Sequence, residues 1–367
     1  MVQKNLEELI QIDRRYICRK NIQKKNTMNT TIYYSPAAIS GTTSPLRRAN
    51  TITPAERIRR ERNRRRMSVL PVFHKVTRDS MDKIWPILEK EPGRTTDFSY
   101  GGMLMWVDYF NYEYAIIEDT LFIRGVVESD RNTPAFSLPV GKLPMADSLA
   151  ILQRYCDANG ETLELSAVPE YALPELTRLG ATKIESLDDW GDYLYDAETL
   201  ATIKGKKMSK KRNHVNQFLT QNPEWSLIDL TPENAHEAME FMDIYDLEGD
   251  DNESAQSERE LTRHMISEIA QGNRYMRGAL LYAGGKVCAF TIADVKGDTL
   301  FIHIEKATRE VAGSYEMINK SFAEKMITEN PSIKYINRED CAGDEGLRKA
   351  KESYHPLEVL KKFNVLF

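Results

Sequence analysis

Residues 301–356 read FIHIEKATREVAGSYEMINKSFAEKMITENPSIKYINREDCAGDEGLRKAKESYHP, and this stretch decides the fold. Apolar side chains alternate with others over residues 299–306, which predicts a strand with two different faces. His303 and Glu305 would then project to the same side. Apolar side chains recur at three- and four-residue steps over residues 315–326, which predicts a helix. A short strand at 334–337 and a helix at 345–353 complete a strand–helix–strand–helix unit.

Four polar residues end the second of these strands, namely Asn337, Arg338, Glu339 and Asp340. In open α/β units, ligands bind where strands end and the following helices begin. We therefore expect the functional site at this end of the unit.

A second polar feature is the basic segment at residues 204–212. It places six cations within nine positions: Lys204, Lys206, Lys207, Lys210, Lys211 and Arg212. Apolar residues follow at helical spacing, so the cations lie at or just before a helix N-terminus, where positive charge is mildly unfavourable. The segment is either a solvated linker or, as we prefer, a binding surface for a phosphate-rich partner such as a tRNA acceptor end, a phospholipid headgroup or a nucleotide.

Composition indicates a globular chain with a basic tail. The 367 residues are 41% hydrophobic and 29% charged, which allows two domains. Residues 1–66 carry a net charge of +11 and the remainder −16, so we predict a disordered basic tail. The tail is either a dispensable extension or an arm for nucleic acid or an anionic membrane.

Several features point to a cytoplasmic protein, placed in the cytoplasm or against the inner face of the membrane. No apolar run reaches the roughly 20 residues of a transmembrane helix, and the N-terminus has no secretion-signal pattern. The four cysteines form no CxxC pair, so no metal site is expected.

The pattern of elements predicts two similar lobes. Residues 67–200 form the first lobe, 201–230 a basic junction and 231–367 the second lobe. The second lobe has two helices, two antiparallel strands joined by a turn at Gly284 and Gly285, and then the opening unit, whose first strand is the third of this antiparallel set. Apolar pieces at 357–360 and 363–367 would add a closing hairpin. The same order in the first lobe suggests a duplicated acyltransferase-like α/β fold.

The loop at residues 309–314, before the helix at 315–326, is a weak match to a coenzyme A pyrophosphate loop. Such loops need small residues that let backbone amides approach the phosphates. Here the register is Arg-Glu-Val-Ala-Gly-Ser, in which Ala and Ser replace the expected glycines. The sequence therefore does not require acetyl-CoA, although an acetyl-CoA-dependent N-acetyltransferase remains an alternative.

Four motifs carry a family resemblance: GKKMSKKRNHVNQF, HIEKA, GSYEMINKSFA and YINREDCAGDEGLRKAKESYHP. They resemble stand-alone proteins similar to the C-terminal catalytic domain of phosphatidylglycerol lysyltransferases (DUF2156-like), a group related to Fem-type aminoacyltransferases. The resemblance covers about residues 72–367. It implies tandem acetyltransferase-like (GNAT-type) lobes with mixed, mostly antiparallel sheets.

The resemblance also implies transfer of an aminoacyl group from charged tRNA to an amine or hydroxyl acceptor, which can be a lipid, a peptide or a small molecule. No further cofactor is expected. Cys341 and Ala342 depart from the family pattern, as does the lack of a multi-span N-terminal region. A non-catalytic binding protein of the same fold is a further alternative.

Roles follow for the residues at the predicted site. The catalytic candidates are His303, Glu305 and Arg338. His303 or Glu305 would deprotonate the acceptor, and Lys306 or Arg338 would stabilise the oxyanion or hold a phosphate. An acidic pocket would alternatively hold the ammonium of the aminoacyl group. The substrate-binding candidates beyond the basic segment are Lys306, Arg309, Glu339 and Asp340.

Three residues near the predicted site also have structural interpretations. His303 is equally well explained as a hydrogen-bonded structural residue. Lys351 is expected on a solvated helix face, and Tyr354 in packing.

Overall fold

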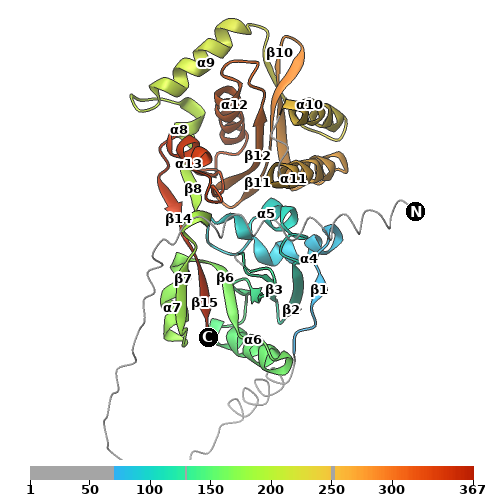
Figure 1. Cartoon of the computed structure of the whole chain (residues 1–367), viewed down its shortest axis with the longest axis vertical. Coiled ribbons are helices and arrows are strands. Elements are labelled where there is room, and N and C mark those ends of the chain that lie inside the picture. Colours follow the sequence, from blue (N-terminus) through green and yellow to red (C-terminus); the bar gives the residue numbers. More distant parts are fainter. Residues whose placement is uncertain (1–69, 129, 249–252) are drawn as a thin grey trace, which may run out of the picture.

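The computed structural model describes residues 70–128, 130–248 and 253–367 (Figure 1). The predicted basic tail lies outside these residues. Two mixed sheets form the described part of the chain, one in each lobe. Figure 1 shows the lobes one above the other, with α5 between them. The predicted fold class, tandem acetyltransferase-like α/β lobes, is confirmed.

The elements follow one another in a simple order. The first part of the chain contains β1 (His74–Lys75), α4 (Arg78–Leu88), η1 (Thr96–Phe98), α5 (Tyr100–Met105), β2 (Glu113–Ile117), β3 (Thr120–Val126), β4 (Pro134–Phe136), β5 (Val140–Gly141), α6 (Met145–Asn159), β6 (Glu164–Pro169), η2 (Glu170–Ala172), α7 (Leu173–Arg178) and β7 (Lys183–Ser186). The second part contains η3 (Asp188–Trp190), β8 (Asp192–Asp196), α8 (Ala197–Thr202), α9 (Ser209–Gln221), β9 (Ser226–Asp229), α10 (Ala235–Glu248), α11 (Glu253–Ala270), β10 (Met276–Ala283), β11 (Lys286–Lys296), β12 (Thr299–Ala307), α12 (Ser314–Glu329), β13 (Tyr335–Asn337), α13 (Glu345–Glu352), β14 (Glu358–Leu360) and β15 (Lys362–Leu366).

The two sheets share one topology. The first has the order β1-β2-β3-β4-β6-β15-β7 with β5 also on β3, and the second, read in the same sense, is β9-β10-β11-β12-β13-β8-β14. Only one pair in each sheet is parallel, β4 with β6 and β12 with β13. The duplication that the sequence suggests is thus visible strand by strand.

The sixth strand of each sheet comes from the other half of the chain. β8 leaves the first half and pairs with β13 and β14 in the second sheet. β15 at the C-terminus pairs with β6 and β7 in the first sheet. The closing hairpin predicted for residues 357–367 is therefore wrong, because β14 and β15 belong to different sheets. The exchange ties the lobes together through two backbone crossings.

Local sequence explains where the elements begin and end. Thr77 caps α4, and Ser80 completes the capping box by hydrogen bonding back to Thr77. Gly160 ends α6 with a left-handed φ of 68°. Gly284 and Gly285 both have positive φ in the β10–β11 turn, as the sequence predicts. The strand and helix boundaries of the opening unit agree with prediction within about two residues.

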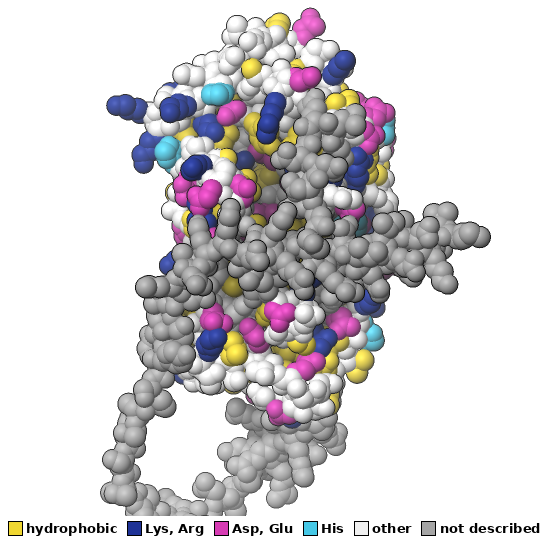
Figure 2. All heavy atoms as spheres, viewed as in Figure 1, with side chains coloured by type: hydrophobic (Ala, Val, Ile, Leu, Met, Phe, Trp, Pro, Cys, Tyr) yellow, Lys and Arg dark blue, Asp and Glu magenta, His cyan; other side chains and the backbone are white. Residues whose placement is uncertain are grey.

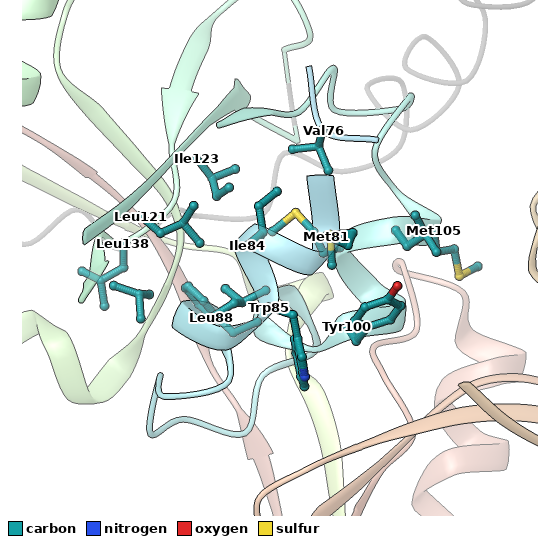
Figure 3. Packing of buried hydrophobic residues seen from close by; sticks show 14 of the residues in the cluster. Val76, Met81, Ile84, Trp85, Leu88, Tyr100, Met105, Leu121, Ile123 and Leu138 are labelled. Atoms are coloured by element: carbon teal, nitrogen blue, oxygen red, sulfur yellow. The ribbon is translucent and has the colours of Figure 1, made fainter. Parts of the chain in front are cut away.

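The core of the first lobe forms between α4 and β3. Met81, Ile84 and Leu88 on one face of α4 are fully buried and share a cluster with Leu121 and Ile123 (Figure 3). Complete burial of each such side chain stabilises the fold by about 1.5–3 kcal/mol. This cluster continues through α5 onto α10, α11 and one face of the second sheet, while α8, α9 and α12 cover the other face.

Among the helices in the described ranges, none combines the length and apolar character required of a membrane span.

Candidate functional site

The site lies where β12 and β13 separate. The two parallel strands pair from Thr299–Tyr335 to Phe301–Asn337. Beyond this point β12 continues to Ala307 paired with β11 but no longer with β13. Side chains beyond the last pair therefore face each other across a fork. This places His303 and Glu305 from β12 near Arg338 and Glu339, which follow β13, as the sequence predicts for a site at strand ends.

Arg338 and Glu305 form an ion pair in this fork. Arg338 Nη2 donates to Glu305 Oε1 at 2.8 Å, and Asn319 of α12 donates to the other carboxylate oxygen at 3.2 Å. The Arg338 guanidinium also lies 4.8 Å from the ring centre of Tyr354 and 5.8 Å from that of Tyr195. These contacts hold the guanidinium in one orientation.

The second terminal nitrogen of Arg338 is available for a ligand. Arg338 Nη1 is buried and has no hydrogen-bond partner among the described residues. Burial lowers the pKa of Arg338, but the Glu305 carboxylate and the nearby tyrosines outweigh burial and leave the pKa raised overall. A permanently charged group with one nitrogen anchored and another unpartnered suits an anionic ligand.

His303 occupies a β-bulge and makes different contacts from Glu305. On β11, Ile292 pairs with Ile304 and Ala293 pairs with Ile302, so His303 is the extra residue. The bulge breaks the alternation that the sequence predicts, and the two side chains do not share a common set of partners. Bulges of this kind re-aim side chains beside active sites.

The His303 ring lies in a buried chain of charges. Nδ1 is 2.7 Å from Glu339 Oε1 and Nε2 is 3.4 Å from Asp294 Oδ2, and the side chain is fully buried. Burial lowers the pKa of His303, but hydrogen bonds and attraction to the two carboxylates raise it to about 10. A raised pKa favours the protonated ring, which fits the structural interpretation of His303 better than the role of a base. Its catalytic role stays a prediction.

The contacts of His303 join the two lobes. The Gly101 amide of α5 donates to Asp294, and a Cβ at Gly101 would overlap the His303 ring. Thr96 Oγ1 donates to Glu339 Oε1 at 3.1 Å. Glu339 itself has a left-handed φ of 59°, which turns its side chain back toward this interface. Glu339 is thus engaged by protein groups from both lobes.

Asp340 and Lys351 complete this side of the fork. Burial raises the pKa of Asp340 to about 6, against an opposing effect of the Lys362 ammonium. The Lys351 ammonium donates to the backbone carbonyls of Arg338 and Asp340. The prediction that Lys351 lies on a solvated face is therefore wrong, since it is buried and fixes the loop that carries Arg338 and Asp340.

The basic segment lies at the start of α9, as predicted. Lys204, Lys206, Lys207 and Lys210 are exposed, and Figure 2 shows Lys and Arg side chains gathered along the upper-left edge where α9 lies. Arg212 instead donates to the carbonyls of Ile203 and Gly205 and holds the loop before α9.

Lys211 connects this surface to the fork. Its ammonium lies 4.0 Å from the ring centre of Tyr354, on which Arg338 also stacks, and 3.4 Å from Glu316 at the start of α12. Burial lowers the pKa of Lys211, and Glu316 partly opposes this. Of the predicted cations of the basic segment, Lys211 is the one whose described contacts reach the fork.

Two predicted residues lie apart from the fork. Lys306 pairs with Glu258 of α11 and lies 5.6 Å from the ring centre of Tyr245. Arg309 is exposed in the loop between β12 and α12. Sequence reasoning missed Asn319, whose only signal is a polar residue on the buried face of α12. It also missed Asp294, which is distant in sequence and has no motif.

Three solved structures have folds similar to that of this chain. A protein of unknown function from Bacteroides thetaiotaomicron is 27% identical, with a TM-score of 0.72 over 81% of this chain and all of that chain. The L-PGS structure from Bacillus licheniformis is 15% identical, with a TM-score of 0.55 over 78% of this chain and 91% of that one. The FemX structure is 10% identical, with a TM-score of 0.51 over 81% of this chain and 97% of the FemX chain. The last two show the fold alone.

An uncharacterised protein of Mycoplasmoides gallisepticum is 24% identical over 175 residues, or 47% of this chain. The chain spans about half the length of this curated relative, 55%. The family described as "Phosphatidylglycerol lysyltransferase, C-terminal" matches residues 91–366. Fold and family together support a transferase. On the strength of a match covering three-quarters of its length, the chain belongs to the family of phosphatidylglycerol lysyltransferase C-terminal domains.

Proposed function

We propose that this chain transfers an aminoacyl group from charged tRNA to an amine or hydroxyl acceptor. The observation that carries the proposal is the contact of Lys211 and of Arg338 with the same ring, Tyr354, because it joins the basic segment at residues 204–212 to the fork. The exposed lysines would hold the phosphates of the acceptor end, and the fork would receive the esterified terminus. Family membership and the Fem-like fold support the same reaction class.

The chemistry needs little covalent participation by the protein. The acceptor nitrogen or oxygen attacks the carbonyl carbon of the aminoacyl ester, and the bond from that carbon to the ribose oxygen breaks. The acceptor loses a proton and the ribose oxygen gains one. Arg338 Nη1 would stabilise the oxyanion that develops during attack, with Glu305 holding the guanidinium in place.

Asp340, two residues after Arg338, is a further candidate for proton transfer beside His303. It is only partly buried, and a carboxyl whose pKa is near 6 is largely ionised at neutral pH and able to accept a proton. A general base with a pKa close to the working pH is effective in both directions of transfer.

The acetyl-CoA alternative has weaker structural support. A Cβ at Gly313, the N-cap of α12, would collide with the backbone carbonyl of His214 in α9. α9 is thus packed against the end of α12 where a pyrophosphate would need access to backbone amides. The segment expected to bind anions occupies this position instead.

The acceptor is proposed to be an anionic phospholipid headgroup or a small amine at the membrane surface. This rests on the family to which the chain belongs and on the exposed lysines of the basic segment, which would also attract an anionic surface.

A direct transfer assay tests the proposal. Purified protein is incubated with a mixture of radiolabelled aminoacyl-tRNAs and either phosphatidylglycerol vesicles or small amines. Label is expected in the acceptor fraction, and acetyl-CoA is expected to give no acetylated product from the same acceptors. Absence of label in every acceptor, together with no tRNA binding at low salt, would overturn the proposal.

A further inference from the structure

The first lobe contains a small polar cavity between β3, β4 and β6. Its volume is about 20 Å³, which is room for one water-sized group. The lining includes two acids, three hydroxyl side chains and three phenylalanine rings: Asp97, Glu128, Ser137, Ser166, Tyr112, Phe98, Phe110 and Phe136. This mixture of acceptors and ring faces is unusual for a simple packing defect, because genuinely empty cavities in proteins are apolar.

The cavity occupies the position in the first sheet that the fork occupies in the second. β4 and β6 pair at Phe136–Leu165, as β12 and β13 last pair at Phe301–Asn337. Two residues beyond each pair the backbone is left-handed, with φ of 53° at Ala167 and 59° at Glu339. By this alignment Ser166 corresponds to Arg338. The first lobe therefore has a small hydroxyl where the second has a guanidinium.

Because the first lobe has Ser166 where the second has Arg338, no guanidinium is present there to pair with Glu128. The residue is only 8% exposed, and its Oε2 atom has no hydrogen-bond partner among the described residues. Lys362 is the nearby ammonium, but it lies 2.9 Å from both Asp97 and Asp192 and is satisfied by them. A buried carboxyl oxygen with no partner is costly, so a ligand that supplies a donor would stabilise the site.

The charges around Glu128 favour a cationic ligand. Burial raises the pKa of Glu128 to about 8, Lys362 opposes this, and Asp97, Asp340 and Asp192 raise it further. Three acids and one ammonium thus surround a carboxyl that lacks its own counter-ion. A cation entering the cavity would displace the Glu128 proton and offset the excess negative charge.

We propose that this cavity binds the primary ammonium group of a small ligand, as a second site distinct from the Arg338–Glu305 fork. Glu128, Ser137 and Ser166 line the cavity and would supply acceptor oxygens for the three N–H donors of an ammonium. The Ser166 hydroxyl already donates to Asn364 at 2.7 Å and so has its lone pairs available. The Phe98 and Phe136 rings add cation–π attraction. The site goes beyond the proposed transfer reaction, because its occupancy can be measured without turnover.

Calorimetric titration of the full chain with methylammonium chloride tests this inference. Tetramethylammonium and sodium chloride serve as comparison ligands, since both are cations and neither has an N–H to donate. Glu128→Gln keeps the shape and removes the charge, and Glu175→Gln, an exposed acid on α7, is the matched control. Amino-acid amides and phosphoethanolamine then show which class of molecule carries the group.

Methylammonium is expected to bind the wild type and Glu175→Gln alike, and at least about tenfold more weakly to Glu128→Gln. Its affinity should rise between about pH 6.5 and about pH 8.5, because the bound state needs Glu128 ionised. Equal binding of sodium or tetramethylammonium, or unchanged binding in a folded Glu128→Gln variant, would overturn the inference. Far-ultraviolet circular dichroism and an unfolding curve establish that each variant is folded.

Discussion

Lys362 on β15 and Asp192 on β8 meet at 2.9 Å, although each belongs to a strand that one half of the chain contributes to the sheet of the other half. Lys362 also lies 2.9 Å from Asp97. Burial lowers the pKa of Lys362, but these carboxylates, with Asp340 and Glu128, raise it well above its usual value. Asp192 further accepts hydrogen bonds from the Thr96 amide and from Asn337. This pair is the centre of the interface between the lobes.

Replacing Lys362 should strongly destabilise the protein. Lys362→Met keeps the chain length but leaves Asp97 and Asp192 buried without their cation, which costs about 3–5 kcal/mol of the free energy of unfolding. Lys361→Met, at the exposed neighbour, should change it by less than about 0.5 kcal/mol. Urea unfolding followed by circular dichroism measures both, and similar values for the two variants would contradict the role assigned to Lys362.

Stability should depend on pH through His303. Its pKa is raised in the folded state, so its contribution is fully present below the unfolded pKa of about 6.5 and is lost as pH rises through about 10. The difference in unfolding free energy between the wild type and His303→Gln should therefore be largest near pH 6 and shrink steadily toward pH 10. A constant difference, or one that grows with pH, would show that His303 is neutral in the folded protein.

Arg338 should be needed for transfer in a way that Lys cannot replace. Arg338→Lys keeps the charge but loses the forked geometry that holds Glu305 with one nitrogen and leaves another for the ligand. We expect kcat/KM to fall by about 10²–10³, the usual effect of removing an oxyanion-stabilising donor.

Arg309→Lys, at an exposed position, is the matched control for that substitution and should stay within about threefold of the wild type, as expected for an exposed substitution. An unfolding curve must accompany the kinetics, because Glu305 is buried. Equal activity of a folded Arg338→Lys variant would remove Arg338 from the mechanism.

The exposed lysines of the basic segment, which lie just before α9 and in its first turn, should contribute to tRNA binding through phosphate contacts. The triple variant Lys206→Glu, Lys207→Glu and Lys210→Glu should weaken binding and reduce the slope of log affinity against log salt by about 2, at roughly 0.7 for each lost contact with single-stranded nucleic acid.

A control with the same change in total charge comes from exposed lysines of the first lobe: Lys83→Glu, Lys90→Glu and Lys142→Glu. Filter binding over a salt series gives both slopes. An equal loss in the two triple variants would mean that α9 acts only through net charge.

Much of the second lobe could be predicted because its signals are local. Alternating and three-to-four-residue apolar spacing identified β12 within about one residue of its bounds and α12 within about three, and the Gly284–Gly285 turn needs only its own backbone conformation. The placement of Arg338 and Glu305 in one site followed from the rule that strand ends converge, although their ion pair was not predicted. These inferences depend on residues that are close in the chain.

The rest was decided by contacts between distant segments. No local pattern shows that β15 joins the first sheet or that β8 joins the second, because both strands satisfy the same apolar alternation in either sheet. The bulge at His303 and its burial between Asp294 and Glu339 could not be read from the local pattern. The sequence by itself determined the elements and the basic segment, whereas the electrostatics of the site depended on which carboxylates the folded lobes bring together in a buried region.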